Sequence, residues 1–130
     1  MVGDPIGDLI NRIKTAQMAG LPEVTVPFSK LKYEIASLLL KEGFVGEVSK
    51  RGKKVKKFLD VVLKYDNKRP EVTGTQRISK PSRRVYFKVG DIRPVKYGQG
   101  LLVLSTPRGI LSGKDARKEG VGGEALFKIW

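Results

Sequence analysis

Residues 28–44 read FSKLKYEIASLLLKEGF and define a helix with a signal at each end. Ser29 is a typical N-cap residue, because its hydroxyl accepts a hydrogen bond from an unpaired amide of the first turn. Phe28, just before the cap, is placed to pack on Tyr33. Gly43 and Phe44 match the closure in which a glycine ends a helix and the next residue touches its last turn. The apolar positions between these ends recur at helical spacing: Leu31, Ile35, Leu38 and Leu39.

The flanking segments complete an N-terminal domain over residues 1–66. Asp4-Pro5 predicts the start of a first helix, since Asp4 is able to accept from first-turn amides and proline suits the first helical position. Residues 23–27 form a short extended segment, and residues 44–65 indicate a hairpin with Arg51-Gly52 near its turn. The predicted order is α-β-α-β-β.

The polar stretch 66–70 breaks all periodicity and is the predicted domain boundary. Residues 67–130 then form a mainly β C-terminal domain with strands at 72–79, 84–89, 101–104 and 124–130. One short helix is predicted to start at Ser112, with Asp115 as its capping partner, and to stop at Gly120. The fold class is α+β, with two small domains.

The charge of the chain points to a polyanionic partner. Its 130 residues include 26 Lys and Arg against 13 Asp and Glu, a formal net charge of +13, and both halves carry the excess. A folded domain with this charge repels itself, so a partner that neutralises it, nucleic acid above all, is the simplest explanation. A merely lysine-rich protein is the less favoured alternative.

Composition also excludes much chemistry. The chain has no Cys and no His, which removes disulfides, the usual zinc sites and the commonest nucleophile and base. We expect no cofactor and no metal. The apolar runs are too short for a membrane span and no signal peptide is recognisable, so a cytoplasmic setting is expected. A Ser105–Lys114 pair is imaginable for catalysis, but no motif positions a base, and we predict no enzyme activity.

Residues 50–57 contain six basic residues in eight, enough to bind phosphate strongly. A mobile lysine tip supplies charge without geometry, so we favour a solvated hairpin tip over specific recognition. Residues 78–86 are more informative, because they combine the cations Arg83 and Arg84 with Tyr86. That ring either stacks on an unpaired base or contacts a sugar, or else it is half-buried in the core, and the sequence favours neither the contact role nor the core role.

Two further segments carry candidate RNA contacts. Ser105-Thr106-Pro107-Arg108 follows a buried strand and would present two hydroxyls and a cation on a short turn, although an ordinary polar loop fits equally well. Gly122-Gly123-Glu124 lacks the context of a phosphate-binding glycine motif, so we expect its glycines to allow either close backbone approach or turns with a positive φ. Glu124 would orient a base edge or an arginine.

These segments together resemble the bacterial family of ribosomal protein eight of the small subunit. The likeness runs the length of the chain and rests on residues 4–9 with 12–14, then 27–30, 41–44, 63–65, 77–81 with 84–86, 104–106 and 116–124. It implies a non-enzymatic structural component that binds the central domain of small-subunit ribosomal RNA early in assembly, beside neighbouring ribosomal proteins. The resemblance also implies possible repression of translation through a messenger RNA that mimics the ribosomal site.

In the family a Ser-Thr-Ser loop, an aromatic residue and a Gly-Gly-Glu run make the C-terminal contact, while the N-terminal domain contacts phosphates. The RNA-binding residues predicted here are Asp4, Arg12, Lys14, Ser29, Lys30, Arg83, Arg84, Tyr86, Ser105, Thr106, Pro107, Arg108, Gly122, Gly123 and Glu124. Pro107 replaces the usual third serine and loses one hydroxyl, and Gly113 replaces an acid often found after the helix cap. The alternatives are a non-ribosomal nucleic-acid-binding protein and a protein-interaction scaffold.

Overall fold

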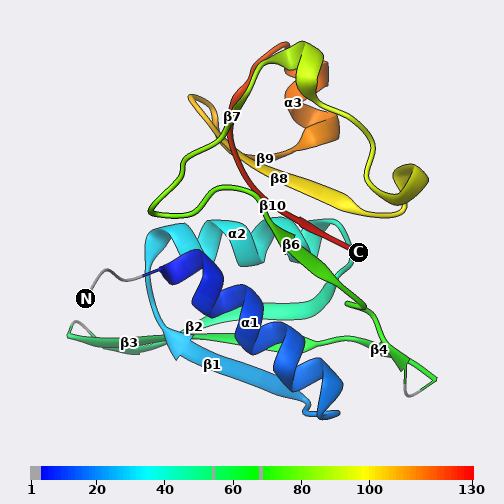
Figure 1. The fold of residues 1–130 in the computed structure, drawn as a ribbon. Helices are drawn as coiled ribbons and strands as arrows, with labels where there is room; N and C mark the ends of the chain where they lie inside the picture. Colours follow the sequence, from blue (N-terminus) through cyan, green and yellow to red (C-terminus); the bar gives the residue numbers. More distant parts are fainter. Residues whose placement is uncertain (1–3, 54, 68) are drawn as a thin grey trace. The chain divides into compact units, whose positions relative to one another are not determined.

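A computed structural model describes residues 4–53, 55–67 and 69–130 (Figure 1). The described residues divide into two compact units, Pro5–Thr73 and Asp4 with Gly74–Trp130. The polar stretch at which the sequence suggests a boundary forms a small two-stranded sheet, β4 (Tyr65–Asp66) with β5 (Arg69–Pro70), inside the first unit. No helix in the described part of the chain has the length and apolar character to cross a membrane.

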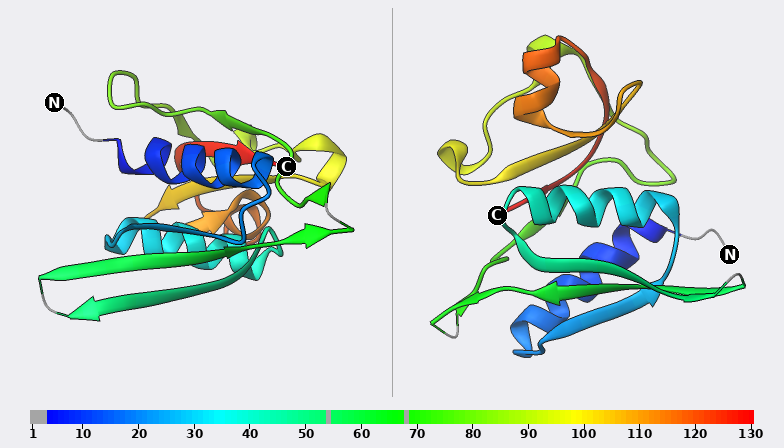
Figure 2. Two further views of the ribbon diagram at one scale, coloured as in Figure 1. Left: turned by 90° about the horizontal axis from the view of Figure 1, so that it is seen from below. Right: turned by 180° about the vertical axis from the view of Figure 1, so that it is seen from behind.

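The first unit has the predicted α-β-α-β-β order. Its elements are α1 (Pro5–Met18), β1 (Glu23–Pro27), α2 (Lys30–Lys41), β2 (Val45–Lys53) and β3 (Lys56–Leu63). The strands form an antiparallel sheet in the order β1-β3-β2, and both helices cover one of its faces (Figures 1 and 2). Alternate residues Leu59, Val61 and Leu63 of β3 are buried, as the two-residue period of a strand facing helices requires.

Both ends of α2 follow the sequence signals. The Ser29 hydroxyl accepts a hydrogen bond from the Lys32 amide at 3.2 Å. At the C-terminus Gly43 has a φ of +82°, and the Phe44 amide donates to the Leu39 carbonyl at 2.8 Å. These bonds satisfy groups that a helix end leaves unpaired. The predicted contact of Phe28 with Tyr33 is confirmed, with ring centroids 6.0 Å apart.

Asp60 on β3 links all three strands of this sheet. Its carboxylate accepts hydrogen bonds from Arg51 of β2 at 2.9 Å and from the Thr25 hydroxyl of β1 at 2.6 Å. The bond from Arg51, followed by the bond from Thr25, holds the pKa of Asp60 below its usual value. A carboxylate with a lowered pKa in the folded state stabilises that state only while it is ionised.

We therefore predict a stability loss in acid that depends on Asp60. Its contribution is fully present above its unfolded pKa of about 3.9 and disappears as the pH falls through the lower folded pKa. Urea midpoints at pH 6 and pH 3 should differ more for the wild type than for Asp60→Asn. Equal differences in the two proteins would contradict this assignment.

The second unit is built around the C-terminal strand. Its strands are β6 (Thr75–Arg77), β7 (Tyr86–Phe87), β8 (Leu101–Thr106), β9 (Gly109–Ser112) and β10 (Gly123–Ile129). The order is β6-β10-β8-β9, and β7 also pairs with β10. The helix α3 (Gly113–Glu119) packs with Ala116 among Leu102, Leu104 and Ala125. Two short 3-10 turns lie at Val89–Asp91 and Lys96–Gly98.

Several strands differ from the sequence prediction. The segment predicted at 72–79 is a strand only at Thr75–Arg77, since the Val72 amide bonds instead to the Gln17 side chain of the first unit at 2.9 Å. The 84–89 segment shortens to Tyr86–Phe87, because the Ser79 hydroxyl binds the Val85 amide at 2.8 Å. Strand β9 was not predicted, because its residues read as a loop before the helix.

The helix α3 begins and ends as predicted. The Ser112 hydroxyl accepts from the Asp115 amide at 3.1 Å, and Gly120 closes the helix with a φ of +71°. The alternation expected along residues 124–130 is interrupted, because the pairing of β10 with β8 shifts between Ala125 and Phe127. Such a bulge sets two residues opposite one and explains why Ala125, Leu126 and Phe127 are all buried.

Candidate nucleic-acid interface

Three predicted contact residues form one row across the sheet of the second unit. Glu124 on β10 lies opposite Tyr86 on β7 and opposite Ser105 on β8. Directly opposed residues of antiparallel strands project from the same face, so the three side chains are neighbours. Leu104 packs with α3, so the row lies on the face away from that helix. We call Tyr86, Glu124 and Ser105 the sheet row.

Tyr86 is the aromatic end of the sheet row. The sequence left open whether its ring is exposed or buried, and the structure places it 69% exposed while its neighbour Phe87 packs against the core. An exposed ring on a rigid strand has its faces available for stacking or for a sugar contact. Strand β7 therefore supports a contact role for Tyr86 and a core role for Phe87.

Glu124 is a fixed acceptor in a basic surrounding. Its carboxylate accepts from the Arg84 guanidinium at 3.0 Å, and its side chain is 15% exposed whereas that of Arg84 is 55% exposed. A carboxylate has several acceptor positions, so this bond orients the group and leaves acceptor capacity for a ligand. The sequence predicts that Glu124 orients a base edge or an arginine, and this pair confirms the arginine contact.

The two hydroxyls of the predicted loop have different surroundings. Thr106 donates to the Gly109 carbonyl at 2.8 Å and accepts from the Arg108 amide at 3.1 Å, so it closes the β8–β9 turn. Its donor is therefore used within the protein. The Ser105 hydroxyl has no hydrogen-bond partner among the residues that the structure describes, so its donor and acceptor positions remain available.

Pro107 and Arg108 form the turn between β8 and β9. In a tight turn, proline is favoured at the second position and glycine at the fourth, as Pro107 and Gly109 are here. Gly109 has a φ of +106°. The fixed φ of Pro107 thus fits the turn in which it replaces the serine usual in the family. The Arg108 guanidinium contacts Glu119 at 3.1 Å at the end of α3, and both side chains remain partly exposed.

The glycines beside the sheet row set the spacing of the strands. A Cβ on Gly123 would lie 2.2 Å from the Ser105 carbonyl oxygen, and one on Gly122 would lie 2.3 Å from the Phe87 carbonyl oxygen. Only glycine allows so close an approach. Of the two roles that the sequence predicts for these glycines, close backbone approach is confirmed for Gly122 and Gly123, which bring β7, β10 and β8 together beneath the row.

A tight turn precedes Arg84. Lys80 and Arg83 exchange backbone hydrogen bonds at 2.9 Å, and both side chains are exposed. Asp4 belongs to this same unit, where its carboxylate accepts from Arg77 at 2.6 Å. The sequence predicts that Asp4 caps the first helix, and the structure pairs its carboxylate with Arg77, which is distant in sequence.

The remaining predicted residues lie on the helices of the first unit. Arg12 is exposed on α1 and pairs with Asp8 at 3.1 Å, and Lys14 is half-buried on the same helix. Ser29 serves as the α2 N-cap, and Lys30 is exposed beside it. Among the described residues of this unit, α1 carries Arg12 and Lys14 and the start of α2 carries Ser29 and Lys30, so two separate elements supply these four side chains.

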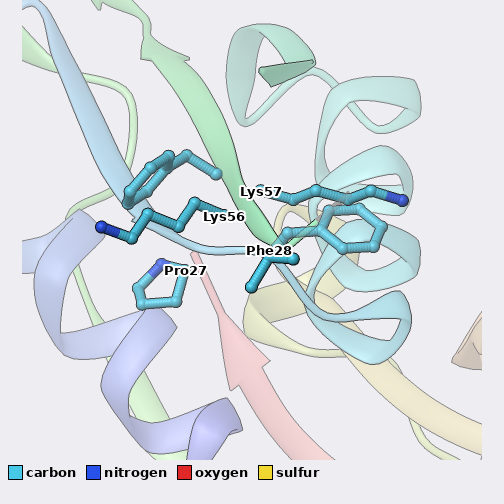
Figure 3. Close-up of a pocket in the computed structure, with 6 residues that line it drawn as sticks. Pro27, Phe28, Lys56 and Lys57 are labelled. Atoms are coloured by element: carbon cyan, nitrogen blue, oxygen red, sulfur yellow. The ribbon is translucent and has the colours of Figure 1, made fainter. Parts of the chain in front are cut away.

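The lysine-rich hairpin has more order than its sequence suggests. The ammonium group of Lys50 lies 4.7 Å from the centre of the Tyr33 ring, and that of Lys57 lies 6.0 Å from the centre of the Phe28 ring. Beside them is a hollow of about 390 Å³ lined by Pro27, Phe28, Val55, Lys56, Lys57 and Phe58 (Figure 3). The helix-capping signal identified Phe28 and Tyr33 but not their contact with lysines.

The fold and these surfaces define a basic α+β protein of the kind that binds nucleic acid. The family model described as Ribosomal protein S8 matches residues 4–130. Small ribosomal subunit protein uS8 of Solibacter usitatus is 42% identical over 131 residues and covers the whole of both chains. Those of Chloroflexus aggregans and Dictyoglomus thermophilum are 46% and 43% identical over 132 and 129 residues, each covering 99% of this chain and 98% of the relative.

The chain therefore belongs to the ribosomal protein S8 family. This membership confirms the resemblance drawn from the sequence, and it agrees with the expectation of a structural protein that is not an enzyme.

Proposed function

We propose that this protein is a structural component of the small ribosomal subunit in the cytoplasm. It binds the central domain of the subunit's ribosomal RNA and lies beside other ribosomal proteins. Membership of the family supports the ribosomal assignment. The observation that carries the site is the sheet row, in which an exposed ring, an oriented carboxylate and an unengaged hydroxyl share one face. Such groups fit the sugars and base edges of an irregular RNA minor groove.

The cations supply affinity and the sheet row supplies selectivity. Lysine and arginine contacts to phosphates release counterions and depend on salt, whereas contacts to sugars and base edges depend on the shape of the RNA. The experiment is a titration of the protein with a central-domain rRNA fragment, an unrelated RNA hairpin of equal length and a DNA duplex, at several salt concentrations. Preference for the fragment by about 10³ or more, persisting as salt rises, is expected.

Two other results would contradict the proposal. Equal affinities that fall together with salt would describe a generic polycation, as would equal binding to duplex DNA. Absence of salt-dependent binding to any nucleic acid would instead describe a protein-interaction scaffold.

Removing one hydroxyl of the sheet row should weaken recognition without weakening the fold. Ser105→Ala is expected to cost about 1–3 kcal/mol of binding to the central-domain fragment, because the RNA group that met the hydroxyl is left unpaired. The salt slope should stay unchanged, since no phosphate contact is lost. Ser49→Ala, on exposed β2, is the matched control. Equal effects of the two variants would refute a special role for Ser105.

A further inference from the structure

The β2–β3 hairpin carries cations that the rest of the protein does not neutralise. It extends beyond the end of α2 (Figure 2). Lys50, Lys53, Lys56 and Lys57 form no salt bridge with any other residue in the described parts of the chain. Arg51, among the described cations of the hairpin, does form one, with Asp60. Because unpaired like charges so close together repel one another, the free hairpin is under electrostatic stress that an anion would relieve.

The strand register sorts these cations onto two faces. Lys50 is opposite Leu59, and Lys57 is two residues from Leu59 along β3, so both project from the face that the helices cover. Arg51 is opposite Phe58 and projects from the other face, where Asp60 binds it. The helix-side face thus presents unpaired ammonium groups, while the opposite face is partly neutralised.

Aromatic rings hold the two helix-side lysines. Lys50 lies 4.7 Å from the Tyr33 ring centre and 5.5 Å from that of Phe28, and Lys57 lies 6.0 Å from the latter. Cation–π attraction restricts these side chains before a partner arrives. Lys50 and Lys57 are therefore not the mobile lysines that the sequence suggests, because aromatic rings restrict their positions. We call these two residues the backed lysines.

The surroundings favour a phosphate backbone over a base. The ammonium groups already lie over the Phe28 and Tyr33 rings, so these faces are not open for base stacking. The adjoining hollow is lined largely by Pro27, Phe28, Val55 and Phe58, which offer no side-chain hydrogen-bond groups to read a base edge. In Figure 3 the Lys56 and Lys57 ammonium groups point to opposite sides of this hollow.

We propose that the backed lysines form a second RNA-contact surface, which binds backbone phosphates without reading sequence. This inference rests on the proposed function, since it assumes that the protein binds RNA, but it assigns a separate role to a segment outside the sheet row. The hairpin raises affinity for any RNA equally, and the sheet row selects the correct one.

The test compares two charge-matched double variants, Lys50→Gln/Lys57→Gln and Lys53→Gln/Lys56→Gln. Both remove two exposed positive charges from the same hairpin. Binding of each variant and the wild type is titrated with the central-domain fragment and with the unrelated hairpin between 50 and 200 mM salt. Circular dichroism and urea unfolding check that the fold is retained.

The backed-lysine variant should lose affinity for both RNAs by the same factor. The slope of log affinity against log salt concentration should fall in magnitude by about 1.4–1.8 relative to the wild type. The loss of affinity between 50 and 200 mM salt should therefore be roughly ten-fold smaller in the variant. The Lys53→Gln/Lys56→Gln variant should show a clearly smaller change. Tyr33→Leu keeps every charge but removes a ring, and we expect roughly two- to ten-fold weaker binding because Lys50 must then be immobilised by the RNA.

The outcomes separate this surface from the proposed function. If the wild type binds both RNAs and the backed-lysine variant keeps the same affinity and salt slope, the proposal for the hairpin is overturned and the proposed function stands. An acidic protein as the true partner of the hairpin would produce this result. Equal losses in the two double variants would also overturn it, because position on the hairpin would then be irrelevant. Failure of the wild type to bind either RNA would overturn the proposed function together with this surface.

Discussion

Replacement of Phe127 with alanine is expected to lower the free energy of unfolding by about 3–5 kcal/mol, the range for removing a large buried aromatic side chain. Phe127 is fully buried and is the largest such side chain in the described chain. It lies at the bulge of β10, the strand that pairs with β6, β7 and β8. A cavity there removes packing at the strand on which the unit depends.

Trp130 provides the measurement for Phe127→Ala. It is the only tryptophan of the chain and exchanges backbone hydrogen bonds with Gly74 at 3.0 Å, so its fluorescence reports on the second unit. The urea midpoint of that signal should fall sharply. Val55→Ala, at a side chain that is 93% exposed, should leave the midpoint in place. A Phe127→Ala midpoint as high as that of Val55→Ala would show that β10 does not hold the unit together.

Replacement of Gly123 with alanine is expected to cost about 3 kcal/mol of stability, at the upper end of the usual range for overpacking. The new Cβ would lie 2.2 Å from the Ser105 carbonyl oxygen, and this neighbour is backbone, which cannot rotate away. Strands β8 and β10 must separate at the position where the sheet row crosses them. Specific RNA binding should therefore weaken together with stability.

Gly90→Ala is the matched control for Gly123→Ala. A Cβ at Gly90 would meet nothing within 4 Å, and its φ lies outside the positive region. The added methyl should therefore leave the free energy of unfolding unchanged or raise it by up to about 1 kcal/mol, because alanine lowers the conformational entropy of the unfolded chain. Two quantities are measured for each variant: the urea midpoint of the Trp130 fluorescence and the affinity for the central-domain fragment at fixed salt. Both should fall for Gly123→Ala, and neither should fall for Gly90→Ala. Unchanged values for Gly123→Ala would mean that the strands tolerate a wider spacing.

Local rules made much of the fold predictable. The caps Ser29 and Ser112 and the helix-ending glycines Gly43 and Gly120 act within a few residues of the helix ends that they satisfy. The order of elements in the first unit follows from periodicities of the same short range. The strands after residue 70 were less predictable. The backbone amides of Val72 and Val85 donate to side chains of Gln17 and Ser79, whereas in a regular strand they would pair with the backbone of a neighbouring strand.

The candidate site was predictable in its residues but not in their roles. Family-like motifs indicated Tyr86, Ser105 and Glu124, and the structure brings these three together. It also uses the Thr106 hydroxyl to close a turn and Gly122 and Gly123 to space strands. A sequence motif does not distinguish a side chain that meets a ligand from one that builds the surface beneath it.

The sequence by itself determined the helix ends, the α+β class, the excess of base and the lack of Cys and His chemistry, because each depends on composition or on neighbours along the chain. Only the tertiary structure decided which of Ser105 and Thr106 has an available hydroxyl and which lysines rest on aromatic rings. Those properties depend on strand register between segments far apart in sequence. Register is set by how buried faces fit together, and no single strand carries that information.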